Sequence, residues 1–361
     1  MLNGAWWDLL LLGKLKTHGC DNILVLHELN NMNTYTFPIL RLLADGKFHS
    51  GEVIAQRLNV TRTTVWLAIK HAASIGVQVY SVPGRGYKLP TALNLLDELA
   101  ISQAIGEQRA WFKLEVLDEI DSTNSYLMRQ IAGAKNSNAV AHATCVAAQV
   151  QTKGRGRRGR SWQAGLGASL TFSLLWRFQC GASGLSGLSL AVGVALIRAL
   201  HGLGVVEAQL KWPNDVLING KKLAGILIEL QGDMEGPSTA VMGIGINMNL
   251  PESLRSTIDQ PAIDLHSVTT HPIDPNELLG HILKHLADVL STFERDGFAS
   301  VRQEWSQYHA YDAKPVRLLM PDGREVQGVV NGVAEDGILL VETATGLQRF
   351  SSGEISLRGA L

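Results

Sequence analysis

The chain has 361 residues, too many for one compact core, so two or three domains are expected. Its composition, 46% hydrophobic and 18% charged, is typical of a globular protein and excludes a largely disordered chain, a collagen and a coiled coil. The formal net charge of −1 hides a local excess: residues 33–90 carry seven Lys or Arg against two Asp or Glu. This excess of +5 predicts a small basic module that meets a polyanion, unless it is a chance excess on a solvated face.

Neither a secretory leader nor a membrane span is expected. No apolar run is expected to approach the roughly 18–20 residues that cross a bilayer, and the nearest, Trp6–Leu12, is interrupted by Asp8. No basic residue precedes this run, which argues against a secretory leader. The cysteines Cys20, Cys145 and Cys180 are scattered and form no CxxC pair, so neither a disulfide framework nor a metal site is expected. The chain is predicted to be cytoplasmic.

Residues 1–32 show no clean periodicity and are interpreted as an N-terminal extension, with the hypothesis that Met32 is the true start. Residues 33–90 are predicted to form a winged helix-turn-helix domain, because a short turn separates two capped helices within 51–70. The caps are Ser50 and Thr61. An apolar helix over 38–44 precedes them, and a strand, a Pro-Gly turn and a returning strand over 77–89 follow as the wing.

Residues 97–311 mix strands and helices. Strands are predicted at 140–149, 170–178, 223–230 and 240–247, a long apolar helix at 186–203, and another helix after the cap Asp274. From 312 to 361 short alternating runs are separated by hairpin signals, which predict a small β-barrel.

The most informative segment is Lys153–Trp162, in which five of the first eight residues are cationic and the other three are glycine. Mutual repulsion and glycine entropy make such a loop costly to order, unless a multiply charged anion binds it. Arginine forks suit phosphate or carboxylate oxygens, and glycine amides can form an anion-binding nest. The alternative is a flexible basic loop or an RNA-binding arm.

Three further segments carry polar or small residues at element ends. The run 211–229, Lys-Trp-Pro-Asn-Asp through an Asn-Gly turn to Lys-Lys-Leu-Ala-Gly, predicts a hairpin in which Lys211 either snorkels to water or meets an anion. Asp121–Asn124 places neutral hydrogen-bonding side chains at a helix entrance, where a plain N-cap is the alternative. Gly243–Asn247 ends a strand with small residues that a ligand could approach.

These segments, in this order, resemble the biotin–protein ligases, and the resemblance covers about residues 35–361. The winged module, with Val-Pro-Gly-Arg-Gly-Tyr at 82–87, resembles that of the bifunctional bacterial form, which also represses the biotin operon. The implied fold is an α+β multidomain chain. It has the winged domain, a central mixed α/β catalytic domain like that of class II aminoacyl-tRNA synthetases over 97–311, and an SH3-like β-barrel over 312–361.

The resemblance implies a two-step reaction. The biotin carboxylate attacks the α-phosphate of MgATP to give biotinyl-5′-adenylate and pyrophosphate, and a lysine of a biotin carboxyl carrier protein of acetyl-CoA carboxylase then attacks the anhydride. Biotin, ATP and Mg²⁺ are therefore expected. So are biotin operon operator DNA, with the adenylate as co-repressor, and a homodimer formed on ligand binding.

The resemblance also assigns residues to roles. Fixed cations stabilise the charge that develops when a carboxylate approaches a triphosphate. The expected catalytic residues are Lys211, Arg155 and Arg157. The expected biotin-binding residues are Ser122, Thr123, Asn124, Gln151, Arg155, Gly156, Arg157 and Lys211. The expected adenylate contacts are Trp162, Asn214 and Asn247. The expected DNA contacts are Thr61, Arg62, Thr63, Lys70 and Arg85.

Two points depart from the family pattern. The segment 248–266 has no aromatic residue to stack on adenine, so an aliphatic side chain such as Ile263 or Leu265 is expected to cover the base, and which residue does so is left open. Trp66 stands where a recognition helix usually has a small polar residue, which leaves the operator sequence open. The competing functions are a lipoate ligase, a transcription factor that only senses biotinyl-adenylate, and a ligase whose winged module no longer binds DNA.

Overall fold

The computed structural model describes residues 34–133, 140–163, 165–320, 322–351 and 356–359, which fall into two compact units, 1–93 and 94–361. The expectations for residues 1–32, Met32 and Cys20 lie outside the described residues. The boundary at 93/94 is close to the one predicted at 90. Residues 312–361, predicted as a separate barrel, pack into the same unit as the central region.

Among its described residues, the first unit has the order helix, helix, helix, hairpin. A helix over 34–43 precedes α3 (Gly51–Leu58) and α4 (Arg62–Ser74), and β1 (Tyr80–Val82) pairs antiparallel with β2 (Gly86–Lys88). The side chains of Ser50 and Thr61 accept hydrogen bonds from Val53 N and Thr64 N, so both predicted caps are confirmed. The described helix already includes residue 34, earlier than the predicted start at Pro38, and Pro38 lies beyond the first turn of these described residues.

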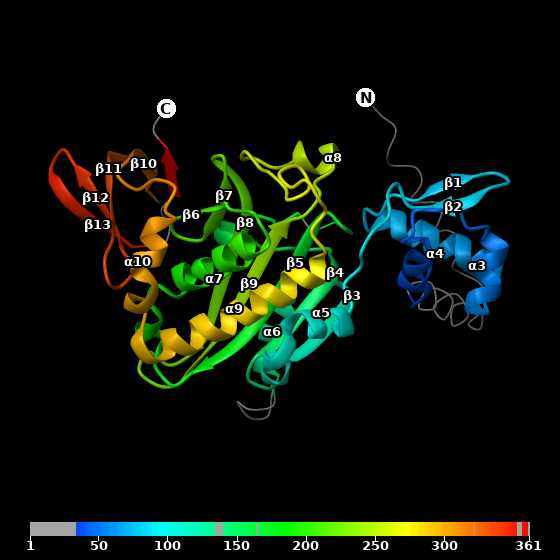
Figure 1. The fold of residues 1–361 in the computed structure, drawn as a ribbon, viewed down its shortest axis with the longest axis horizontal. Helices are drawn as coiled ribbons and strands as arrows, with labels where there is room; N and C mark the ends of the chain where they lie inside the picture. The colour runs from blue at the N-terminus through cyan, green and yellow to red at the C-terminus, as the bar shows by residue number, and fades with distance from the viewer. Residues whose placement is uncertain (1–33, 134–139, 164, 321, 352–355, 360–361) are drawn as a thin grey trace, which may run out of the picture. The chain divides into compact units, whose positions relative to one another are not determined.

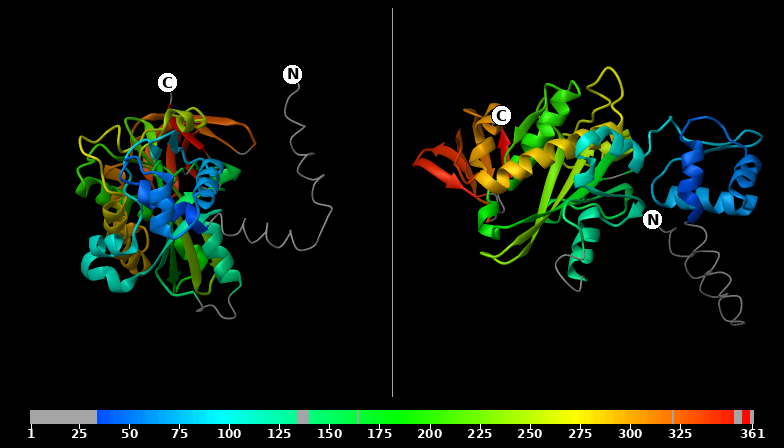
Figure 2. Two further views of the ribbon diagram at one scale, coloured as in Figure 1. Left: turned by 90° about the vertical axis from the view of Figure 1, so that its right-hand side faces the viewer. Right: turned by 60° about the horizontal axis from the view of Figure 1, so that its bottom comes forward.

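The second unit is built on a seven-stranded mixed sheet with the order β3-β4-β5-β9-β8-β7-β6 (Figures 1 and 2). Its strands are β3 (Lys113–Ile120), β4 (Thr144–Gln151), β5 (Ser169–Phe178), β6 (Gln209–Lys211), β7 (Asp215–Ile218), β8 (Lys221–Gly232) and β9 (Ser238–Asn247). Only β3 and β4 are parallel; the other neighbours are antiparallel. The predicted hairpin through Asn219–Gly220 is confirmed as β7–β8.

Helices cover both faces of this sheet. On one face lie α5 (Glu98–Ile105), α7 (Leu188–Gly202) and α9 (Pro275–Asp296), with α10 (Ala299–Gln307) beside them (Figure 1). On the other face α6 (Thr123–Ala132) packs its Leu127 and Ile131 against Val146 and Leu175. Because strand side chains alternate, Cys145 and Ala147 join the first core and Val146 joins the second.

The C-terminal strands form a five-stranded antiparallel sheet with the order β13-β12-β11-β10-β14. They are β10 (Pro315–Leu319), β11 (Glu325–Val333), β12 (Leu339–Thr343), β13 (Gly346–Phe350) and β14 (Ser356–Gly359). Val316, Leu318 and Leu339 belong to the same buried cluster as α7 and α9. The indole Nε1 of Trp212 also donates to Gly337 O at 3.1 Å, which ties this sheet to the segment between β6 and β7.

One segment corrects the expectation about apolar runs. Residues Ala182–Gly202 are long and apolar enough to cross a bilayer by length and composition. However, eleven of the fifteen residues of α7 within it are buried, ten of them in the hydrophobic core of the unit, so it is the central helix of a folded domain. No second segment of this kind occurs among the residues with described positions.

Candidate functional site

A cavity of about 340 Å³ opens on the α6 side of the large sheet. Its floor is open because three glycines, Gly225 in β8 and Gly243 and Gly245 in β9, project no side chain toward α6 and its neighbours. A Cβ on Gly243 would lie 2.3 Å from Asn124 Oδ1, and one on Gly245 would lie 2.4 Å from the Trp162 indole. The glycines therefore make room for the two side chains that shape the cavity.

Ten of the expected ligand-binding residues line this cavity. They are Ser122, Thr123, Asn124, Gln151, Arg155, Gly156, Arg157, Trp162, Asn214 and Asn247. Of the ionisable side chains among its lining residues, four are cations (Arg155, Arg157, Arg160 and Lys222) and one is a carboxylate, Asp259. A cavity with this balance favours an anionic ligand.

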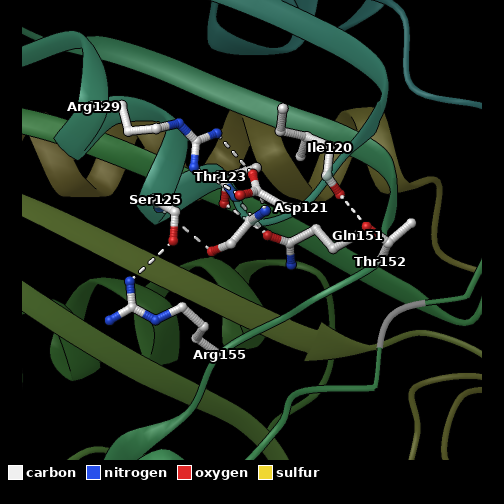
Figure 3. A network of polar contacts seen from close by, with 9 residues as sticks. Ile120, Asp121, Thr123, Ser125, Arg129, Gln151, Thr152 and Arg155 are labelled. Carbon is white, nitrogen blue, oxygen red and sulfur yellow. Dashed lines mark hydrogen bonds and ion pairs between the residues drawn. The ribbon is translucent and has the colours of Figure 1, made fainter. Parts of the chain in front are cut away.

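The neutral end of the cavity is built at the start of α6, where Ser122 is the N-cap and Thr123 faces Gln151 (Figure 3). Gln151 Oε1 accepts hydrogen bonds from Thr123 N at 2.7 Å and Thr123 Oγ1 at 3.2 Å, which leaves the amide nitrogen of Gln151 for a ligand. Ser173 Oγ, fully buried, lies 2.7 Å from Thr123 Oγ1 and 2.6 Å from Asn124 Oδ1. This network fixes the rotamers of two cavity residues, and sequence reasoning missed Ser173 because it lies in the middle of a buried strand.

Glu229 connects the neutral end to the basic loop. Its carboxylate accepts from Asn124 Nδ2 at 2.9 Å and pairs with Arg155 Nη2 at 2.7 Å, while Arg155 Nη1 donates to Ser125 Oγ (Figure 3). On the other side of α6, Arg129 and Asp121 form a two-pronged ion pair, and this pairing lowers the pKa of the Asp121 carboxyl. Both contacts hold the start of α6 in place.

The loop 153–162 folds back on itself as a short hairpin. Gly156 N donates to Arg160 O and Trp162 N donates to Gly154 O, and Arg155 and Ser161 form a bridge. Burial lowers the pKa of the Arg157 guanidinium, a desolvation cost that a bound anion would offset. Trp162 lays its indole across Gly225 and Gly245, with Lys222 Nζ 5.7 Å from the ring centroid. The indole thus forms one wall of the cavity.

Lys211, at the end of β6, lies beside the cavity and is not among its lining residues, so its expected role stays a prediction. Lys222 of β8 lines the cavity instead. Lys222 Nζ lies 2.6 Å from Asp215 Oδ1, and both side chains are mostly buried. Lys211 lies close enough to Asp215, Arg358, Lys222 and Arg160 to interact electrostatically with them, and burial lowers its pKa to about 8.

The two asparagines expected near a nucleotide hold the backbone. Asn214 donates to Ile226 O at 2.6 Å and accepts from Arg157 Nη1 at 3.1 Å. Asn247 donates from its amide nitrogen to Lys222 O and Ile263 O, so both of its hydrogens are already used. Asn247 therefore positions Lys222, which sequence reasoning did not foresee.

The segment after β9 reaches the cavity through residues other than those expected. Thr257, Ile258, Asp259, Gln260 and Ala262 line it. Ile263 and Leu265 are buried in the hydrophobic core and are not among the lining residues, so the structure does not favour either of them as the aliphatic that covers a base. Ile258 is the larger aliphatic side chain that this segment presents to the cavity.

In the first unit, the expected DNA contacts occupy two exposed places. Thr61, Arg62, Thr63 and Lys70 are exposed on α4, and Arg85 is exposed in the turn between β1 and β2. Thr61 Oγ1 serves as the helix cap, and the Arg85 guanidinium lies 4.1 Å from the centre of the Phe48 ring. The basic residues are thus presented by one helix and one hairpin, as a winged helix requires.

Three family models match this chain. The helix-turn-helix domain model matches residues 36–88, the biotin/lipoate A/B protein ligase family matches 116–247, and the biotin protein ligase C-terminal domain matches 314–358.

Characterised relatives agree with these matches. The bifunctional ligase/repressor of Escherichia coli K12 is 36% identical over 328 residues, which cover 91% of this chain and 98% of the relative. The biotin–[acetyl-CoA-carboxylase] ligase of Paracoccus denitrificans is 32% identical over 251 residues, 68% of this chain and all of the relative. The structure of the Aquifex aeolicus biotin protein ligase with biotin and ATP is similar over 69% of this chain and 99% of its own, with 32% identity and a TM-score of 0.58.

Proposed function

This chain belongs to the biotin–protein ligase family, in its bifunctional ligase/repressor form, and we propose that it forms biotinyl-5′-AMP and biotinylates a carboxyl carrier protein. The family assignment makes it a biotin–[acetyl-CoA-carboxylase] ligase. The observation that carries the mechanism is the cavity on the α6 side of the sheet, which has neutral hydrogen-bonding groups at one end and four cations around it.

The neutral end suits the ureido ring of biotin, which needs donors and acceptors without charge. Ser122, Thr123, Asn124 and Gln151 are the proposed contacts, and the free amide nitrogen of Gln151 is an available donor. Trp162 is proposed to cover the ligand as one wall, and Gly156 to let the backbone approach it.

The charged part suits a carboxylate that meets a phosphate. In the first step a biotin carboxylate oxygen attacks the α-phosphorus and the bond to pyrophosphate breaks. Arg155, Arg157 and Lys222 are the proposed cations at this junction, where negative charge concentrates in the transition state. We propose that Lys222 takes the role expected of Lys211, because Lys222 lines the cavity.

In the second step the neutral amine of an acceptor lysine attacks the carbonyl carbon of the anhydride. The bond to AMP breaks, AMP leaves as an anion, and the amine loses a proton as the amide forms. No group of three His, Cys, Asp or Glu that could hold a metal ion occurs within the ranges described above. We propose that Mg²⁺ enters bound to the ATP phosphates, since Mg²⁺ usually binds substrate phosphates with only one or two carboxylates.

Lys211 is proposed to face the outgoing phosphates from beside the biotin cavity, close to Arg358 and to the lining residue Arg160. Its pKa of about 8 then predicts a pH dependence. As the pH rises through about 8 the ammonium loses its proton, so the kcat/KM for ATP in pyrophosphate release is expected to fall. Lys211→Arg keeps its charge and is expected to lose this fall, whereas the exposed Lys221→Arg is expected to keep it. Superimposable wild-type and Lys211→Arg profiles would remove Lys211 from this role.

A direct test of the ligase uses the purified full-length chain with biotin, MgATP and an isolated biotin acceptor domain. Mass spectrometry should show one biotinyl group on the acceptor, and none when ATP is omitted. The same mixture with lipoate in place of biotin tests the lipoate ligase alternative. Modification by lipoate and not by biotin would overturn the proposed substrate.

The exposed basic residues of α4 and the wing support a second function, binding of biotin operon DNA with biotinyl-5′-AMP as co-repressor. One recognition helix and one wing offer few base contacts, so a two-fold dimer on a palindrome is proposed to supply the rest. We also propose the domain types that the family resemblance implies: a winged helix-turn-helix domain, a catalytic domain like that of class II aminoacyl-tRNA synthetases and an SH3-like barrel. A cytoplasmic location is proposed as well.

Regulation gives a measurable prediction. Biotinyl-5′-AMP is expected to strengthen both self-association and binding to the chain's own biotin operon promoter, and the acceptor protein is expected to reverse both. Sedimentation and DNA-binding titrations at one stated salt concentration measure these changes, because phosphate contacts make affinity salt-dependent. A chain that ligates biotin without either change would be a ligase whose winged domain does not act as a repressor.

A further inference from the structure

The exposed face of α4 carries a large aromatic side chain that the fold does not use. Val65, Ala68 and Ala72 of this helix are buried, whereas Trp66 is 46% exposed. Lys70, one turn later, places its Nζ 3.8 Å from the centre of the Trp66 ring. The indole is therefore held on the outer face beside a cation, and it adds little to the core of its unit.

The surroundings of Trp66 indicate the kind of partner. No acidic residue occurs between 61 and 79, and Arg62 and Lys70 are exposed on the same helix. This charge complements a polyanion, and the ordered helix presents it as a strip narrow enough for a major groove. An indole offers one donor and no acceptor, so it cannot form a two-pronged hydrogen-bonded pair with a purine edge. Its large apolar surface instead matches the one apolar group that bases display in that groove, the C5-methyl of thymine.

We propose that Trp66 is a specificity-determining residue that contacts a thymine C5-methyl in the major groove of the operator. Lys70, which lies over one face of the ring, holds the indole on the outer face of α4. The ammonium of Lys70 then faces the adjacent phosphate or guanine edge. This inference rests on the proposed DNA-binding function and adds to it the base that one side chain recognises.

The test begins with selection of preferred duplex sites by the full-length wild-type chain with biotin and MgATP. Each thymine of the selected site is then replaced in turn by deoxyuridine, which removes only the methyl group. At one thymine per half-site the affinity of the wild type is expected to fall about three- to fivefold, the value of one buried methyl. Trp66→Ala is expected to bind thymine and deoxyuridine duplexes equally at that position, and Trp111→Ala, which removes another exposed indole, is expected to behave as wild type.

The outcomes separate the two claims. If the wild type selects a defined site but deoxyuridine has the same effect on wild type and Trp66→Ala, the role of Trp66 is overturned and DNA binding stands. If the wild type binds no duplex better than random sequence, both the inference and the proposed repressor function fail. Unchanged binding of Trp66→Ala to random duplex, with an unchanged salt dependence, confirms that its winged unit is folded.

Discussion

Lys222→Ala is expected to slow biotin-dependent pyrophosphate release by about 10²–10³-fold, the usual cost of removing one group aimed at developing charge. Lys222 is the lysine that lines the cavity, and Asn247 holds its carbonyl. The neighbouring Lys221 is exposed and provides the matched control, since Lys221→Ala removes the same charge from the same strand. Near-normal release by Lys222→Ala, with Lys221→Ala also normal, would contradict the assignment.

The Lys222 variant also removes the ion-pair partner of the mostly buried Asp215 carboxylate, which keeps only the more remote charges of Lys211 and Arg157, so a loss of thermal stability is expected. The double variant Lys222→Ala/Asp215→Asn removes this problem. We expect the double variant to regain thermal stability without regaining activity. Recovery of both together would mean that Lys222 serves the fold and not the reaction.

Gly245→Ala is expected to impair binding of biotin and ATP while the sheet still forms. The new Cβ would lie 2.4–2.7 Å from three atoms of the Trp162 indole, which must then leave its place as a wall of the cavity. Overpacking of this kind costs about 1–3 kcal/mol, so we expect affinity for biotin, measured by calorimetry, to fall about 10–100-fold. Gly202→Ala is the control, because a Cβ there meets no atom within 4 Å.

A double-mutant cycle locates the clash. If the indole is what the new methyl displaces, Gly245→Ala should add no further loss in a Trp162→Ala background. Equal losses in both backgrounds would place the effect in the pairing of Gly245 with Gly225 and Thr171 instead. Thermal unfolding of all four proteins shows whether the sheet tolerates the change.

The cavity also shows how this chain tolerates several cations in a small volume. Glu229 pairs with Arg155, and Asp215 pairs with Lys222, so two of the four lining cations have a carboxylate partner outside the lining. An incoming anion competes with these carboxylates rather than meeting isolated charges. This arrangement lowers the repulsion within the loop without removing the cations from the place where a carboxylate and a phosphate would meet.

Local signals were sufficient for much of this protein. Helix caps and tight turns depend only on residues a few positions apart, so they can be recognised in the sequence alone. The sequence therefore located the helices that begin after Ser50, Thr61 and Asp274, and the hairpin that turns at Asn219–Gly220. The basic glycine-rich loop and the polar residues at the start of α6, which both line the cavity, were also recognisable from the sequence, because their unusual composition is itself the signal.

Only the tertiary structure decided which lysine reaches the cavity. The pairing of β7 with β8 shifts register between Val216 and Leu217, so that consecutive residues Leu223 and Ala224 both face the core. Because of this irregularity, the side chains of β8 change the face of the sheet on which they lie. Lys222 therefore lies on the same face as Gly225, which is the face that lines the cavity. A one-residue shift in pairing changes the face of every side chain beyond it, and it depends on contacts between strands. The local sequence left Lys211 either snorkelling to water or meeting an anion, and the packed sheet places Lys222 among the residues that line the cavity.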